Sequence, residues 1–291
     1  MESNLCKSDI AQKVHEIRYF PVPNSIVLSL FRTITKKNCT FDEISSIVEP
    51  DASLCAQLLR VANSAYFGFR GKVKTIEKAV MLIGVDEVRN LSLAICLVNQ
   101  FKNGILAKGF DIKKFWVHNL LTAFCAQEIG KDKPFFDKDE LYLMGLLHDI
   151  GRLVMAQLMP DEFNVIEVKA RRLGVYPWTV EQELGIMHTE VGYLLAKKWA
   201  LSEQMAQVLE FHHHPALSKG FSRECAVVAV AAYVAKMVEA SRGAGPEPKL
   251  PDTKVFLLAG MELKQMDDFY NRALDLKNEI DDLANIIVGQ F

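Results

Sequence analysis

The stretch FDEISSIVEPDASLCAQLLRVANSAYF, residues 41–67, contains the spacing that decides the fold. Apolar residues recur three and four positions apart, at Ile44, Ile47, Val48, Leu54, Leu58, Leu59 and Ala62. This spacing places apolar side chains on one face of a helix. Asp51 follows Pro50 and can accept hydrogen bonds from the free amides at a helix start. We therefore predict two helices here, the second beginning after Asp51.

The same periodicity continues along most of the chain. TIEKAVMLIGVDEVRNLSLAICLVNQF (75–101) predicts two more helices, one on each side of Gly84. Three further segments carry helical spacing: 111–130, 139–158 and 179–199. Ser202 is a predicted N-cap for a helix that ends before Pro215. No stretch alternates apolar and polar residues as strands do, so we predict an all-α fold.

Composition limits the class of protein. The chain has 291 residues, of which 50% are hydrophobic and 24% charged, with a net charge of −2. These values are typical of a globular protein, and the absence of a basic surplus argues against a nucleic-acid partner. No apolar run reaches the roughly 18 residues that a membrane helix requires. Six cysteines without a CxxC pair and no signal-peptide pattern favour a cytoplasmic protein without a membrane anchor.

The histidines are distributed unevenly. Six of the seven lie between residues 118 and 214. His118, His148 and His188 each lie on the apolar face of a predicted helix, and the run LEFHHHPAL (209–217) contains the other three. A buried imidazole without a partner costs about 1–3 kcal/mol. Taken singly, each is typical of a core histidine bonded to a backbone carbonyl, so the pattern leaves that alternative open.

A shared metal ion would satisfy several buried imidazoles together. Neutral imidazoles with one or two carboxylates are a usual ligand set for Fe, Mn, Ni or Zn. Asp149 directly follows His148, so both side chains can reach one centre, and a carboxylate can bridge two ions. The spacing is not that of a zinc finger.

Several motifs resemble a known family. LLHDIG (146–151) resembles the HD superfamily of metal-dependent phosphohydrolases. ANSAYFG (62–68), IGVDEVRNL (83–91) and HTEVGYLLAKKW (188–199) resemble the HDOD domain, a helical bacterial signalling module. The resemblance covers roughly residues 18 to 216 and implies an N-terminal helical subdomain joined to an HD-like helical bundle.

The resemblance implies a metal-binding set and a division of the chain. Its metal ligands would be His118, His148, Asp149, His188, His212 and His213. They would hold one or two transition-metal ions, with Fe preferred over Mn, Ni or Zn because the set exceeds four ligands. The segments KNGILAKGFD (102–111) and SRGAGPEPKLPD (241–252) mark breaks. The predicted parts are an extension (1–17), a helical half (18–105), an HD-like bundle (106–240), a linker or loop (241–252) and a C-terminal helical extension (253–291).

Some positions depart from the superfamily pattern. Ala232 stands where the resemblance places a last Asp ligand, and Lys114 where the HD-GYP branch carries an extra Glu. The segment HPALSKGFSRE (214–224) contains no GYP, and His214 replaces a Glu. Arg152 replaces the Lys that often follows the HD doublet. These departures argue against an intact cyclic-dinucleotide phosphodiesterase site.

Three functional hypotheses follow. The first is a regulatory HDOD module with a retained His/Asp metal site. Because no receiver, kinase or output domain is attached, it would act through a signalling protein partner. The second is a metal-dependent phosphohydrolase acting on a nucleotide or cyclic dinucleotide, with Asp149 at the metal and Arg152 holding the phosphate. The third is a structural fold in which the histidines are relics.

Overall fold

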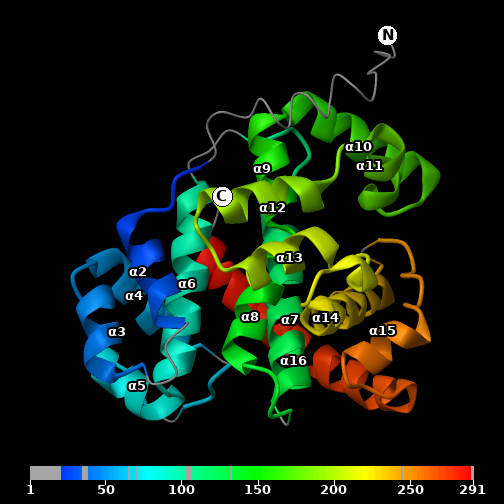
Figure 1. The fold of residues 1–291 in the computed structure, drawn as a ribbon. Helices are drawn as coiled ribbons and strands as arrows, with labels where there is room; N and C mark the ends of the chain where they lie inside the picture. The colour runs from blue at the N-terminus through cyan, green and yellow to red at the C-terminus, as the bar shows by residue number, and fades with distance from the viewer. Residues whose placement is uncertain are drawn as a thin grey trace.

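The structure is a computed structural model that describes residues 21–34, 39–64, 66–69, 71–102, 106–131, 133–243 and 245–289. These residues form helices joined by turns and contain no strand, which confirms the predicted all-α fold (Figure 1). None of the described helices combines the length and the apolar character needed to cross a membrane. The predicted extension 1–17 lies outside the described residues.

An N-terminal group of helices packs around one long helix. The group comprises α2 (Ser25–Ile34), α3 (Phe41–Val48), α4 (Ala52–Ala62), α5 (Ile76–Ile83) and α6 (Val85–Lys102). The helix α6 contacts each of the other four (Figure 1). The Asp51 carboxylate accepts a hydrogen bond from the Leu54 amide at 2.9 Å, which confirms Asp51 as the N-cap of α4. Ile44 and Leu58, from the periodic stretch, are fully buried.

The second group surrounds α7. It comprises α7 (Ile112–Gly130), α8 (Lys138–Leu147), α9 (Ile150–Leu158), α10 (Pro160–Leu173), α11 (Pro177–Leu184), α12 (His188–Lys198) and α13 (Glu203–Phe211). A short 3-10 turn at Pro215–Leu217 then leads to α14 (Ser222–Ser241). The helix α7 is buried along most of its length because α8, α14 and α16 (Met266–Val288) pack against it. The Ser202 hydroxyl accepts a hydrogen bond from the Met205 amide, so the predicted N-cap of α13 is confirmed.

The C-terminal helices bring the two groups together. The next helix in the chain is α15 (Thr253–Leu258), which packs against α14. The last helix, α16, contacts α4 and α6 of the first group and α7 and α14 of the second. Ile280, Leu283 and Ile287 lie on its buried face. The chain therefore ends in a helix that packs on both groups.

Two glycines allow helices to approach closely around the site. A Cβ atom at Gly145 would lie 2.7 Å from the Cα of Ala123, so α8 approaches α7 at this residue. A Cβ atom at Gly151 would overlap the carbonyl oxygen of His188 and lie 2.8 Å from the Gly192 amide nitrogen. The backbones of α9 and α12 are therefore in direct contact beside the residues that form the site.

Candidate metal centre

Four of the six predicted ligands lie at ends of helices. Our expectation of continuous helix through 139–158 was wrong at one point: α8 ends at Leu147 and α9 begins at Ile150. His148 remains in helical conformation, whereas Asp149 has φ −97° and ψ 10°. Adjacent side chains in an unbroken helix diverge by about 100°. The break lets both face the same centre, and His188 begins α12 while His212 caps the end of α13.

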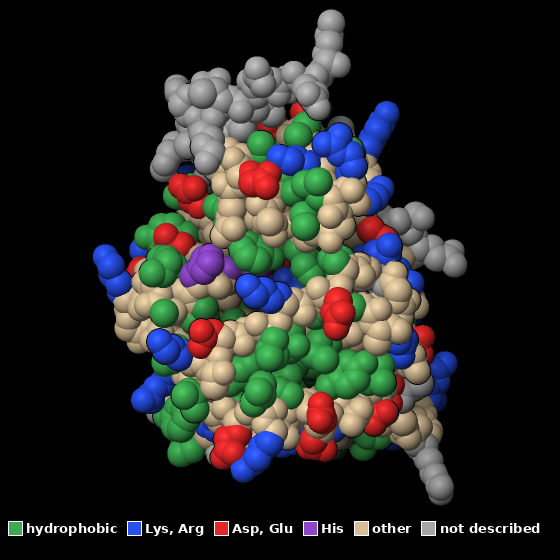
Figure 2. Space-filling model, turned by 90° about the vertical axis from the view of Figure 1, so that its right-hand side faces the viewer, with side chains coloured by type: hydrophobic (Ala, Val, Ile, Leu, Met, Phe, Trp, Pro, Cys, Tyr) green, Lys and Arg blue, Asp and Glu red, His purple; other side chains and the backbone are tan. Residues whose placement is uncertain are grey.

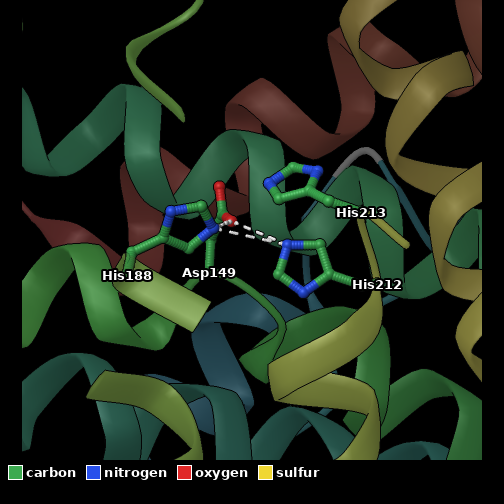
Figure 3. A group of neighbouring side chains, drawn as sticks. All are labelled: Asp149, His188, His212 and His213. Atoms are coloured by element: carbon green, nitrogen blue, oxygen red, sulfur yellow. Dashed lines mark hydrogen bonds and ion pairs between the residues drawn. The ribbon is translucent and has the colours of Figure 1, made fainter. Parts of the chain in front are cut away.

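Four ligand atoms converge on one point. Asp149 Oδ1 lies 3.1 Å from His188 Nε2, 3.5 Å from His212 Nε2 and 3.6 Å from His148 Nε2. The two Nε2 atoms of His188 and His212 are 3.4 Å apart. Figure 3 shows the rings of His188 and His212 turned toward the Asp149 carboxylate, with His213 beside His212. Ligand atoms bound about 2.1 Å from one ion lie about 3.0–3.4 Å from each other at octahedral or tetrahedral angles, so the spacing fits a metal.

Backbone carbonyls fix the orientation of two of these rings. His148 Nδ1 donates to the Gly145 carbonyl at 2.8 Å. His212 Nδ1 is 3.2 Å from the Leu209 carbonyl. A ring that donates from Nδ1 presents an unprotonated Nε2, which is the form that binds a metal.

Carboxylates hold two other rings in the same way. His118 Nδ1 lies 3.1 Å from Glu239 Oε1. His188 Nδ1 donates to Glu181 Oε2, which also accepts the His188 backbone N–H at 2.9 Å. Carboxylate–histidine pairs of this kind are typical of metal-binding histidines, because the acid sets the tautomer and raises the basicity of the ring.

The inward-facing nitrogens lack protein partners. In the described part of the chain, the Nε2 atoms of His118, His148 and His213 are buried and have no hydrogen-bond partner. A buried acceptor without a partner costs about 1–3 kcal/mol, and ligation would remove that cost. The donor set therefore fits a transition-metal ion, for which imidazole nitrogen and carboxylate oxygen are usual ligands.

The cluster divides into two overlapping groups that share Asp149. One group contains His118, His148 and Asp149, and the other contains Asp149, His188, His212 and His213. All six predicted ligands thus lie in these two groups, and Asp149 would contribute an oxygen to a metal held by either group. His214 is the exception in the run of three: it is exposed, and Gln182 Nε2 approaches its Nε2 at 3.2 Å.

The local electrostatics keep most of the cluster in ligating form. Burial holds the pKa of His148 well below its usual value, despite the nearby Asp149, and burial likewise lowers the pKa of His212 and His213. Burial would raise the pKa of Asp149, but His148 and His188 hold it well below its usual range. Burial opposes protonation of His188, yet Glu181 and Asp149 raise its pKa to about 9. His188 would therefore have to release a proton in order to serve as a metal ligand.

The sequence did not reveal Glu181 or Trp178. Glu181 is 1% exposed and orients His188 from the preceding helix, α11. Glu181 lies seven residues before His188 in the sequence. In one continuous helix that spacing would place both side chains on the same face, but α11 ends at Leu184, before His188. The ring of Trp178 stacks on His213, with centroids 4.9 Å apart and planes 20° from parallel. Trp178 therefore packs directly against the ring of a predicted ligand.

Arg152 has two carboxylate partners. Its Nη2 lies 2.6 Å from Glu167 Oε1 and its Nη1 lies 3.5 Å from Glu181 Oε1. The side chain is 17% exposed and lies between these two carboxylates. Through Glu181, Arg152 is linked to the orientation of His188. Its predicted role in holding a phosphate stays a prediction.

A cavity of about 750 Å³ lies above the cluster. Its lining includes His118, Asp149, His188 and His213, with side chains from α7, α10, α14 and α16 forming the walls. Figure 2 views the molecule from the side on which α10, α11, α14 and α15 lie. Acidic and basic side chains are scattered over this face, and neither sign forms a continuous patch. The volume of the cavity is large enough for a small-molecule ligand, which would lie next to the cluster.

Replacing Glu181 by Gln tests its orienting role. We expect metal affinity to fall by about 10–100-fold, because the neutral amide no longer draws the His188 Nδ1 proton as a carboxylate does. Competition with a chromogenic chelator measures the affinity. Glu183→Gln is the matched control, since Glu183 is exposed and paired with Lys169 at 2.6 Å. Equal affinities in the two variants would contradict the role.

The fold and the cluster define an all-helical protein with a candidate His/Asp metal centre. The chain belongs to the HDOD domain family, whose model matches residues 20–215. This confirms the resemblance recognised in the sequence. The matched region includes all six predicted ligands, whereas α14 and α16, which wall the cavity, lie beyond it.

Relatives and solved structures support the same placement. An uncharacterized protein of Treponema pallidum is 27% identical over 213 residues, covering 71% of this chain and 39% of that protein. This chain therefore spans well under half the length of that relative. An HDOD domain protein of unknown function from Geobacter sulfurreducens has a TM-score of 0.76 and 23% identity, covering 98% of both chains. A Shewanella amazonensis protein whose name suggests a phosphohydrolase has a TM-score of 0.73 and 24% identity, covering 96% of this chain and 97% of that one. At these identities the solved structures establish the fold.

Proposed function

We propose that this protein is a bacterial regulatory HDOD module that retains a working His/Asp metal site. One observation carries the proposal. Three imidazole Nε2 atoms lie within 3.6 Å of Asp149 Oδ1, and the other nitrogen of each ring is held by a carbonyl or a carboxylate. If the histidines were relics, neither the convergence of their Nε2 atoms on Asp149 nor the hydrogen-bond partners at their Nδ1 atoms would be expected.

The metal we propose is iron, with Mn, Ni or Zn as alternatives, bound as one or two ions. Six candidate ligands exceed the four that a tetrahedral zinc site uses. When bound, such an ion can stabilise the folded state and polarise a phosphoryl oxygen. The residues of the chain supply the rest: Glu181 and Glu239 orient their imidazoles, and Asp149 contributes negative charge to both groups.

Metal content is the direct test of the proposal. Protein expressed in metal-replete medium should carry one to two transition-metal ions per chain, measured by elemental analysis after desalting. A content below about 0.1 ion per chain would contradict the proposal. Absorption or Mössbauer spectra of the same sample would distinguish iron from the alternatives.

The regulatory role is proposed for two reasons. Ala232 removes a carboxylate that the HD superfamily pattern places on α14, and residues 214–224 lack the GYP loop. A Marinobacter aquaeolei protein of the same fold has a name that suggests signal transduction (TM-score 0.79, 20% identity, 98% of this chain and 67% of that one).

We propose that the present protein works in the cytoplasm with a signalling protein partner, and that a nucleotide-type ligand occupies the cavity.

The alternative is a metal-dependent phosphohydrolase acting on a nucleotide or cyclic dinucleotide. The cavity over Asp149 and His188 favours it, because a ligand bound there lies directly beside the cluster. A phosphodiesterase assay with Mn or Fe against nucleotides and cyclic dinucleotides separates the two functions. A regulatory module should give no turnover above that of a His148→Ala variant. Turnover that the variant loses would establish the alternative.

A further inference from the structure

The wall that α14 contributes to the cavity carries an unusual basic residue. Ala232, Lys236 and Glu239 follow one another at i, i+4 and i+7, so they lie on the same face of α14. Glu239 contacts His118, and both Lys236 and Glu239 line the cavity. Lys236 Nζ lies 5.0 Å from the centroid of the Tyr176 ring, another cavity residue. The ammonium therefore lies at the wall of the cavity, beside Tyr176 and on the helix face that also carries Glu239.

Lys236 has no anionic partner in the part of the chain that the structure describes. Among the described residues no hydrogen bond or ion pair involves its ammonium, although the side chain is partly buried. The acids around it are already engaged: Glu239 with His118, and Glu167 with Arg152. Farther along the wall, Asp281 pairs with Lys277 at 2.6 Å.

The charge balance around Lys236 is unfavourable without a ligand. Burial lowers the pKa of Lys236, and the attraction of Asp149 and Glu239 does not restore it. A metal cation bound to the cluster would add further positive charge nearby. A buried charge without a partner is costly, and an anion placed between Lys236 and the cluster would remove that cost.

We infer that Lys236 is the anion-binding residue of this cavity and that the ligand it accepts carries a phosphoryl group. The inference rests on the proposed function, because the ligand binds over the metal centre. A tetrahedral phosphoryl group points its oxygens in divergent directions, so one oxygen can face Lys236 while another faces the cluster. A carboxylate carries one negative charge, whereas a terminal phosphoryl group carries about −1.5 to −2 at neutral pH, so the phosphoryl group balances Lys236 and a bound metal ion together more fully. Lysine binds phosphate as a point charge, which suits an ammonium with freedom to rotate.

Titration of the full-length, metal-loaded protein with inorganic phosphate tests this inference. We expect Lys236→Met to weaken phosphate binding at least about tenfold by calorimetry, the range for losing a charge-assisted hydrogen bond. Lys236→Arg should keep most of the affinity. Lys113→Met is the matched control, because Lys113 is an exposed lysine at the same cavity and has no partner in the described residues. It should change the affinity by less than about twofold.

Melting temperature distinguishes ligand binding from a structural role. Without phosphate, Lys236→Met should melt at about the wild-type temperature, because removing a cation that has no anionic partner offsets the loss of its contact with the Tyr176 ring. At phosphate concentrations near the wild-type Kd, proteins that keep a basic residue at 236 should gain more stability than Lys236→Met does. A lower melting temperature without phosphate, or an unchanged affinity for phosphate, would overturn the inference. Acetate at equal ionic strength should not replace phosphate; equal, Lys236-dependent binding of acetate would refute the phosphoryl assignment.

Metal content measured on the same samples keeps the two proposals separate. A protein that holds metal but binds phosphate independently of Lys236 refutes this inference and leaves the proposed function intact. A protein that holds no metal refutes the proposed function, whatever its affinity for phosphate.

Discussion

Replacing His148 and Asp149 together by alanine should strip the protein of metal and lower its melting temperature. Asp149 belongs to both groups of the cluster, so its loss removes a ligand from either ion position. His148 contributes a buried Nε2 that no protein group satisfies among the described residues. The four remaining histidines would then have no carboxylate ligand in either group, because Asp149 is the acid in both.

The size of the effect follows from mass action. A ligand present at about 100 times its Kd stabilises a folded protein by about 2.7 kcal/mol. For a protein of this size that corresponds to roughly 5–10 °C in Tm. Differential scanning calorimetry and elemental analysis measure the two losses. The difference from wild type should shrink when both proteins are stripped with a chelator.

A matched control comes from the same histidine run. His214 is exposed and points away from the cluster, toward Gln182. His214→Ala should therefore keep both the metal and the wild-type melting temperature. If the double variant also keeps them, the metal site is not where we place it.

Replacing Gly151 by alanine should have a comparably large effect through packing alone. The added methyl group would overlap the His188 carbonyl oxygen and lie 2.8 Å from the Gly192 amide nitrogen. Both are backbone atoms at the start of α12, and neither can move away alone. The methyl would have to push α9 and α12 apart, which separates Asp149 from His188. We expect a loss of about 3 kcal/mol or more in the free energy of unfolding, together with reduced metal affinity.

Gly192→Ala is the matched control for this prediction. A Cβ atom there would be 3.5 Å from the Leu209 Cβ, an ordinary contact. Since alanine also favours helix over glycine by about 1 kcal/mol, this variant should be as stable as wild type or more so. Urea unfolding compares the two variants. Similar stabilities would mean that α9 and α12 can separate without cost.

The parts of the fold that depend on local signals could be predicted from the sequence. The caps at Asp51 and Ser202 act within a few residues of themselves, and the apolar periodicity defines each helix face. The clustering of the histidines could also be predicted, because His118, His148 and His188 each lie on the apolar face of a helix. The family resemblance added His212 and His213 as a pair.

The features of the site that the sequence did not predict depend on tertiary contacts. The break between His148 and Asp149 has no Gly or Pro at either residue, and packing of Gly151 on α12 accompanies it. Glu181 reaches His188 across a turn, so helical spacing does not connect them. Lys236 stands in the apolar segment VVAVAAYVAKMVE, where its direction depends on how α14 packs against α7. Local pattern carries no information about any of these three.

The predicted ligands lie on separate helices, which affects how the protein would unfold. An ion held there cross-links α7, the α8–α9 junction, α12 and α13, much as a disulfide closes loops in a chain. Loop closure reduces the entropy of partly open states, so these segments should open as one cooperative unit. Hydrogen exchange in the metal-bound protein would then show similar protection across them, and removal of the ion would let each segment exchange at its own rate.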